Sequence, residues 1–150
     1  MEAVRARASV VVGVDFSEGA MLAFREGRWL SRRAGLGLQV VHVADDDLAW
    51  QPDAGATAWL REASLDPGLM LVRQGLPWVE IVRHALEVSS AVVVLGSHGA
   101  SGPQAMTLGS TASRVAMRAP CPVLFVSQRR EHMPYTEIAV PSQHPLQEHP

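Results

Sequence analysis

A few glycine, serine and histidine residues have types and spacing that suit the binding of an anion. Gly96-Ser97-His98-Gly99 directly follows the apolar run 91–95, which ends at Leu95, and nine residues separate Gly99 from Gly109-Ser110-Thr111. A buried strand that opens into such a loop presents backbone N–H groups in a concave nest, and phosphate groups bind there. Two ordinary turns joined by a flexible loop would show the same glycine spacing. The position of the loop in the fold therefore decides between the two interpretations.

The composition narrows the classes of protein to consider. The chain has 150 residues, of which 47% are hydrophobic and 19% charged, as expected for one globular domain. A net charge of −2 gives no electrostatic reason to expect nucleic acid or an anionic membrane as a partner. The apolar runs are too short to span a bilayer, and the N-terminus shows no signal-peptide core. With Cys121 as its single cysteine, the chain is expected to be cytoplasmic.

The chain contains no lysine, because all 13 basic residues are arginine. A Walker-type phosphate loop requires a lysine, so that class of nucleotide site is excluded. Chemistry through a lysine Schiff base is excluded for the same reason. Base composition of the genome explains the bias more simply than any function.

Strand-length apolar runs alternate with segments of helical pattern. The runs are continuous and rich in valine, as in strands of a parallel sheet that is covered on both faces. Alternation of this kind predicts an α/β fold of βαβ units: one open, doubly wound, five-stranded parallel sheet with helices on both faces, for which we take the strand order 3-2-1-4-5. The predicted strands are residues 9–14, 38–43, 69–72, 91–95 and 122–126.

Four helices are predicted from capping residues and apolar periodicity. Ser17 is expected to cap the first, running to about Arg33 with Ala20, Phe24 and Leu30 facing inward and Gly35 past its end. A weaker sequence pattern predicts the second helix, over residues 53–63. Pro77 opens the third, through Glu87, with Val79, Val82 and Leu86 on one face. Ser110 opens the fourth, which stops before Pro120.

Two segments have less regular patterns. Between residues 44 and 68, Asp45-Asp46-Asp47 is interpreted as a solvated loop rather than a metal site, and Trp50 and Trp59 as packing over the sheet edge rather than touching a ligand. The predicted domain spans residues 1–128. Residues 129–150, rich in proline and histidine, are predicted to form an extended tail or one that clasps a partner subunit, with a short edge strand over 138–140 as an option.

The predicted strand order brings distant residues together. Ligands of open parallel sheets bind outside the carboxyl ends of the strands where the strand order reverses, here between the first and fourth strands. The first strand ends at Asp15 and the fourth at Gly96. A carboxylate and a glycine nest about eighty residues apart in sequence are thus expected to face each other.

These residues resemble the ATP-binding branch of the universal stress protein family. The Gly-x2-Gly-x9-Gly-Ser spacing after a fourth strand is similar to the family's motif, and the resemblance extends over residues 8 to 128. Four further stretches are similar to the family's first strand and turn, second strand end, turn into the third helix and entry to the last strand: Val12-Gly13-Val14-Asp15-Phe16-Ser17-Glu18, Val41-His42-Val43, Gly75-Leu76-Pro77 and Ala119-Pro120-Cys121-Pro122-Val123.

The resemblance implies a role for each matching residue. Asp15 would accept hydrogen bonds from ribose hydroxyls, Gly13 and Val14 would line the nucleoside pocket, and Val43 would meet the adenine. Gly96, Gly99 and Gly109 would let the backbone approach the phosphates. Ser110 and Thr111 would offer hydroxyls and N–H groups to the outer phosphates at a helix N-terminus. Leu95 and His98 would border the same site.

For some of these residues a plainer role stays open. Asp15 could serve only as a helix cap, and Ser17 is interpreted as a cap rather than a nucleophile. His98 could touch phosphate or shape the loop. No partner that would orient it for catalysis can be identified, so no catalytic residue is assigned.

The implied function is that of an ATP-binding stress-response or regulatory protein acting through nucleotide-dependent conformation or interaction. AMP or another adenine nucleotide remains an alternative ligand, and Mg²⁺ would be held mainly through the phosphates. The resemblance also implies a homodimer formed through the last strand. Two alternatives remain: an enzyme that hydrolyses ATP or adenylates a substrate, and a ligand-free dimerisation module. The sequence identifies no protein partner.

Overall fold

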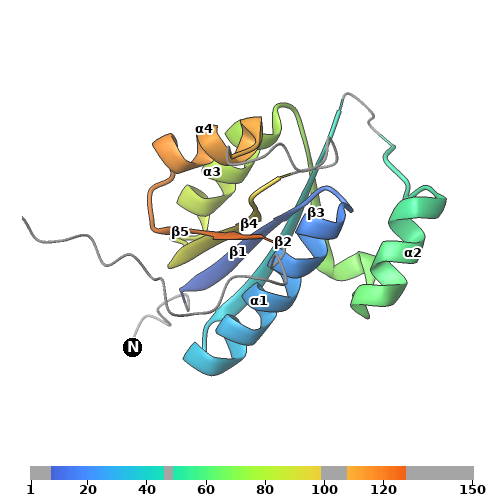
Figure 1. Cartoon of the computed structure of the whole chain (residues 1–150), viewed down its shortest axis with the longest axis horizontal. Coiled ribbons are helices and arrows are strands. Elements are labelled where there is room, and N and C mark those ends of the chain that lie inside the picture. The colour runs from blue at the N-terminus through green and yellow to red at the C-terminus, as the bar shows by residue number, and fades with distance from the viewer. Residues whose placement is uncertain (1–7, 46–48, 99–107, 128–150) are drawn as a thin grey trace, which may run out of the picture.

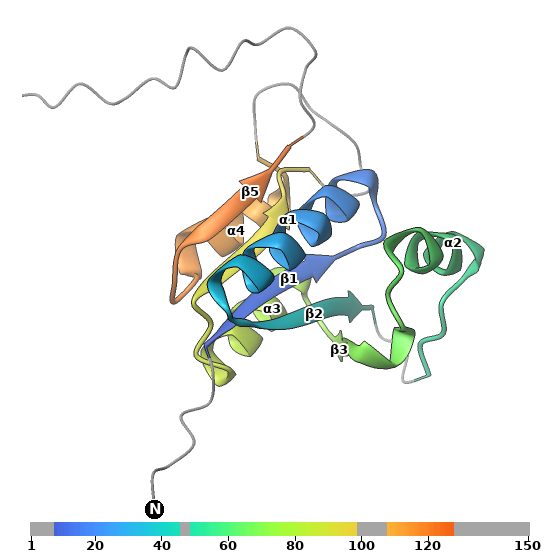
Figure 2. The same cartoon turned by 90° about the horizontal axis from the view of Figure 1, so that it is seen from below.

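The computed structural model describes residues 8–45, 49–98 and 108–127. Within these ranges the chain forms a five-stranded parallel sheet of order β3-β2-β1-β4-β5, which confirms the predicted fold class. Figures 1 and 2 show α1 on one face of the sheet, with α2 beside it, and α3 and α4 on the other. The strands are β1 (Ser9–Val14), β2 (Gly37–Ala44), β3 (Met70–Gln74), β4 (Val92–Gly96) and β5 (Val123–Val126). The helices are α1 (Glu18–Ala34), α2 (Ala54–Ala63), α3 (Pro77–Glu87) and α4 (Ser110–Arg118).

β1 is the central strand, and every one of its residues is buried. It pairs with β2 over its whole length and with β4 from Val10 to Val12. This explains the continuous apolar sequence, because a central parallel strand has helices over both faces and no side exposed to water. β3 begins at Met70 instead of the predicted Leu69. A 3-10 turn, η1 (Pro67–Leu69), occupies the preceding residues, and Asp66 caps it by accepting from Gly68 N at 2.8 Å.

α1 begins and ends as its capping residues predict. The Ser17 hydroxyl accepts from Ala20 N at 3.1 Å, and Gly35 terminates the helix with a left-handed φ of 66°. Ala20 and Phe24 face the sheet as predicted, whereas Leu30 is only half-buried. α1 approaches the sheet closely at Gly27, where an added Cβ would lie 2.4 Å from Val12 Cγ2.

The apolar face predicted for α3 is only partly the face that the helix buries, because Val82 packs against the core whereas Leu86 does not. Leu86 is 59% exposed, and the residues that α3 buries are Glu80, Ile81, His84 and Ala85. The prediction ranked positions by hydrophobicity. It therefore missed a face on which two polar side chains are buried because an arginine of the adjacent strand satisfies them.

The two tryptophans of the segment between β2 and β3 pack within the protein. Trp59 is 6% exposed, in the core cluster formed by α1, α2 and one face of the sheet, and Trp50 packs against that cluster. Neither is among the described residues that line the cavity discussed below. This agrees with the prediction that both side chains pack on the sheet side of the fold.

Some predictions fall outside the described residues: Asp46, Asp47, Gly99, the strand at 138–140 and the whole tail 129–150. The division of the chain at residue 128 therefore remains a prediction. In the described part of the chain, the helices are all too short or too polar to cross a lipid bilayer.

Replacing Gly27 by alanine should destabilise the protein by about 1–2 kcal/mol. Alanine raises helix propensity, but its Cβ would press on the fully buried Val12, and overpacking of a core costs more than the propensity gains. The matched change Gly55→Ala in α2, where the nearest atom to a new Cβ is 3.4 Å away, should stabilise by about 0.5 kcal/mol. Urea unfolding of both variants tests this contrast, and two changes of the same sign would contradict it.

Candidate functional site

A cavity of about 320 Å³ lies at the carboxyl ends of β1, β2 and β4. The strand order reverses here: β2 and β3 follow β1 on one side of it, whereas β4 and β5 lie on its other side. Residues at the beginning of α1, α3 and α4 complete its walls. Ten of the predicted site residues line it: Gly13, Val14, Asp15, Val43, Leu95, Gly96, His98, Gly109, Ser110 and Thr111.

The sequence analysis missed five lining residues, namely Ala20, Val41, Pro77, Ile81 and Ala112. Two could have been found from periodicity. Val41 lies two residues before Val43 on the same strand and so shares its face, and Ile81 lies four residues after Pro77, one helical turn on. Gly99, the remaining predicted residue, lies outside the described residues.

One end of the cavity is apolar. Val41, Val43, Pro77, Ile81 and Leu95 contribute hydrocarbon walls. The floor depends on the absence of a side chain at Gly13, where an added Cβ would lie 2.6 Å from Leu95 Cδ2 and 2.9 Å from Ile81 Cδ1. This end can therefore receive a flat apolar group between the sheet and α3.

The other end is formed by the beginning of α4. Gly109 is its N-cap, and its N–H donates to the carbonyl of Ser97 at 2.9 Å, which ties the helix start to the end of β4. The first N–H groups of a helix lack partners within it, and its N-terminus carries partial positive charge. The described lining residues include no arginine, so attraction of an anion would come from backbone N–H groups.

Close contact between α1 and the end of β4 sets the shape of this region. An added Cβ at Gly19 would lie 2.7 Å from the His98 carbonyl oxygen, and one at Gly96 would lie 2.9 Å from the Gly19 carbonyl carbon. The backbone after β4 therefore rests on the first turn of α1. His98 is held further by its Nδ1, which lies 3.0 Å from Ser97 Oγ.

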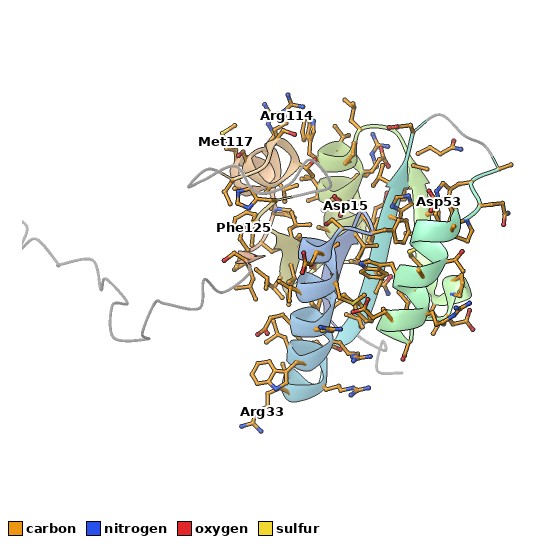
Figure 3. All side chains as sticks on the ribbon, turned by 45° about the vertical axis from the view of Figure 1, so that its right-hand side comes forward. Asp15, Arg33, Asp53, Arg114, Met117 and Phe125 are labelled. Atoms are coloured by element: carbon orange, nitrogen blue, oxygen red, sulfur yellow. The ribbon has the colours of Figure 1, made fainter. Side chains whose placement is uncertain are left out.

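Asp15 stands at the turn between β1 and α1. Figure 3 shows it at one end of α1, with Arg33 at the opposite end. Its Oδ1 accepts from Ser17 N at 3.1 Å, and Ser17 itself is the helix N-cap. The alternative of Asp15 as the cap of α1 was therefore wrong, and Asp15 lines the cavity.

The residue after Asp15 adopts an unusual backbone conformation. Phe16 has a φ of 62°, in the left-handed region that favours glycine, which costs on the order of 1 kcal/mol. Its ring lies in an aromatic cluster formed by Phe16, His42, Trp50 and Trp59. Burial and ring contacts offset the backbone strain.

A polar cluster on β3 and α3 holds the wall that Pro77 and Ile81 contribute. Arg73 donates through Nε to Glu80 Oε2 at 2.9 Å and through Nη1 and Nη2 to Glu87 at 2.7 and 3.1 Å. Arg83 donates to the other oxygen of Glu80 at 2.8 Å. Glu80 is only 6% exposed, so these two cations compensate its burial.

His84 completes this cluster as a neutral ring. Its Nδ1 lies 3.3 Å from Arg73 Nη1, and because a guanidinium only donates, Nδ1 must accept and Nε2 must carry the proton. Nε2 is buried and finds no hydrogen-bond partner among the described residues. Burial, and then the charge of Arg73, lower the pKa of His84 from its ordinary 6.5.

A sequence model of one protein family, the universal stress protein family, matches residues 7–127. The chain belongs to the universal stress protein family. The match spans all five strands, the four helices and the cavity.

Individual universal stress proteins are similar to parts of this chain. YxiE of Bacillus subtilis is 44% identical over 52 residues, which are 35% of each chain. A universal stress protein of Mycolicibacterium smegmatis is 30% identical over 139 residues, covering 82% of this chain and 47% of that protein. The chain thus spans less than half the length of these two relatives. A universal stress protein solved in complex with cAMP is 26% identical, with a TM-score of 0.60 over 81% of this chain and 98% of that one.

Because His84 titrates, this universal stress protein should lose stability in mild acid. In the unfolded chain His84 has an ordinary pKa, and in the folded protein a lower one, so the unfolded state binds more protons below about pH 6.5. The free energy of unfolding should therefore fall as the pH falls from about 7.5 to 5.5, and level off below the folded pKa.

His84→Gln is the matched variant, because its amide oxygen can accept from Arg73 without titrating. Urea unfolding across this pH range should give a shallower slope for the variant, by up to about one proton. The other histidines contribute equally to both proteins. Equal slopes would show that His84 is not the group responsible.

Proposed function

We propose that this chain binds an adenine nucleotide in the cavity between β1 and β4 and acts as a stress-response regulator through nucleotide-dependent conformation or contacts. One observation carries the proposal. The cavity joins an apolar slot over Gly13 to the N-terminus of α4, with the Asp15 carboxylate lining the space as well. A base, a sugar and phosphates present those three chemistries in that order. A structural relative that was solved with cAMP supports the choice of an adenine nucleotide.

Each part of the ligand has residues suited to it. Adenine would lie against Gly13 and Val43, where apolar walls exclude water. Ribose hydroxyls would donate to Asp15, because an ionised carboxylate only accepts. Phosphates would lie at Gly96, Gly109 and Ser110, where backbone N–H groups and the helix dipole favour negative charge. Gly99 and Thr111 would add to the same end, with His98 at its border, and Mg²⁺ would be held mainly by the phosphates.

Binding with slow or no turnover fits the described residues. The polar end offers N–H groups and hydroxyls that stabilise phosphate equally before and after cleavage, which favours binding over rate enhancement. A bound nucleotide would connect the end of β1 to the beginning of α4, elements far apart in sequence. Its presence would therefore change the rigidity of this edge of the sheet, which is a signal that a partner protein can recognise.

Calorimetry on ligand-free protein tests the proposal directly. We expect at least one of ATP, AMP and cAMP, each titrated with and without Mg²⁺, to bind with a stoichiometry of one per chain. A parallel assay for released product should show turnover no faster than background. Absence of heat with every adenine nucleotide would refute the proposal and leave the ligand-free module. Steady turnover would favour the enzyme.

Gly109→Asp should weaken nucleotide binding by at least about tenfold, because it places a carboxylate where the phosphates are proposed to lie. Gly109 has an ordinary N-cap backbone with a φ of −58°, and aspartate is a preferred N-cap, so α4 should still form. Gly109→Asn, which is equally suited to the cap but uncharged, should remain within about threefold of the native affinity. Equal losses in both variants would indicate steric disruption and contradict phosphate binding at this end.

We also propose that the chain forms a homodimer through β5. This strand lies at the edge of the sheet and pairs only with β4 among the described strands, which leaves its other backbone edge available. Leu124 of this strand is 37% exposed, and Met117 of the nearby α4 is 76% exposed. An edge strand with apolar side chains beside it is typical of an interface between two copies.

Leu124→Arg should therefore yield a monomer, since two copies would bring arginines together at a pairing edge. The matched control is Leu86→Arg, at a leucine of α3 that is 59% exposed and away from β5. Light scattering after size-exclusion chromatography should report half the native mass for the first variant and the native mass for the second. An unchanged mass for Leu124→Arg would rule out this interface.

A further inference from the structure

Trp59 contacts the turn between β1 and α1 from a helix far along the chain. Its indole N–H donates to the carbonyl oxygen of Ser17 at 2.9 Å, over a sequence separation of 42 residues. The same oxygen accepts from Met21 N at 3.1 Å in the first hydrogen bond of α1. Trp59 is 6% exposed, so water competes little for this bond. The side chain thus holds the residue at which the turn becomes helix.

The other contacts of the aromatic cluster act on the same turn. The Trp59 ring meets the Phe16 ring edge-on at 5.6 Å, and Trp50 stacks on Phe16 at 5.7 Å. His42 Nδ1 lies 2.9 Å from the carbonyl oxygen of Val14, and because a carbonyl only accepts, this nitrogen carries the proton. Side chains of two elements therefore hydrogen-bond to both ends of the turn: His42 of β2 to Val14, and Trp59 of α2 to Ser17.

Asp15 lies between these two held carbonyls. Its Oδ1 accepts from Ser17 N, so a displacement of Ser17 changes the position of the carboxylate. The left-handed conformation of Phe16 makes the turn depend on outside support, since this region favours glycine. Phe16, His42, Trp50 and Trp59 are not among the described residues lining the cavity, whereas Asp15 is.

We propose that Trp59 is a positioning residue for Asp15: through its hydrogen bond to Ser17 and its contact with Phe16, α2 sets the placement of the carboxylate in the cavity and hence the affinity of the site. The expected effect on affinity rests on the proposed nucleotide function, whereas the expected effect on the turn is independent of it. Because coupling of this kind is reciprocal, a ligand held by Asp15 would in turn stabilise the position of α2.

A purely structural role makes a different prediction. Trp59 also packs in the core with Phe24 and Leu60, so a change there can lower stability without moving Asp15. Trp59→Phe removes the N–H donor and keeps an aromatic ring. Trp50→Phe is the matched control, because it makes the same chemical change in the same cluster and leaves the bond to Ser17 intact.

The first measurement is amide hydrogen exchange on the ligand-free protein. In Trp59→Phe, the amides of Ala20 and Met21, which donate to Ser17, should exchange about fivefold faster, because their acceptor loses its support. The amide of Ser31, buried at the far end of the same helix, should keep its native rate, and Trp50→Phe should change all three by less than about twofold. Equal acceleration at Ser31 would indicate global destabilisation and overturn the proposal.

The second measurement is a double-mutant cycle on nucleotide affinity. Trp59→Phe should weaken binding about fivefold in the native background. In the Asp15→Asn background, which keeps an oxygen for Ser17 N but lacks the charge, it should have no further effect if Trp59 acts through Asp15. His42→Phe, which removes the bond to Val14 and keeps a ring, should behave in the same way.

The outcomes separate the two proposals. Equal weakening by Trp59→Phe in both backgrounds, or none in either, overturns the positioning role. If the native protein binds no adenine nucleotide, the proposed function fails, and the exchange rates at Ala20 and Met21 still decide whether Trp59 holds the turn.

Discussion

The pairing of β1 with both β2 and β4 is the constraint on which the rest of this structure depends. Because all three strands are parallel, each connection must cross a face of the sheet, and the crossovers after β1 and β3 are helices on opposite faces. The connection that leaves β1 and the one that leads to β4 therefore run over opposite faces of the sheet, and a space opens between them at the carboxyl end of β1. The cavity is the space left by that divergence, and residues at or near the carboxyl ends of β1, β2 and β4 line it.

Backbone groups and small residues, more than charged side chains, give this space its chemistry. Gly13 leaves a slot between Leu95 and Ile81, and Gly19 lets the backbone after β4 rest on the first turn of α1. The N-terminus of α4 contributes N–H groups at the other end. A chain without lysine can still form a phosphate site of this kind, because helix N-termini and glycine loops bind anions through the backbone.

Two clusters outside the cavity keep its walls in place, and both contain groups that are costly on their own. Phe16 has a backbone conformation that favours glycine, and contacts with His42, Trp50 and Trp59 stabilise it. Glu80 is buried, and Arg73 and Arg83 compensate its charge. Proteins keep such arrangements where the surrounding structure over-determines them, often near functional sites. Here the first cluster holds Asp15 and the second holds the α3 wall, on opposite faces of the sheet.

The sequence by itself determined the α/β class with five parallel strands, the capping of α1 by Ser17, the beginning of α3 at Pro77 and the convergence of the ends of β1 and β4. These features follow from local rules: continuous apolar runs, capping residues, and the convergence of parallel strands at one edge. The inward face of α3 could not be read in this way, because Glu80 and His84 are buried only where Arg73 of β3 reaches them. The roles of Trp59 and Gly19 were equally invisible, since each depends on a partner far along the chain that is near only after folding. Hydrophobic periodicity reports which residues avoid water, whereas the pairing of buried polar groups, the fit of backbone against backbone and the support of a strained turn are decided by the tertiary structure alone.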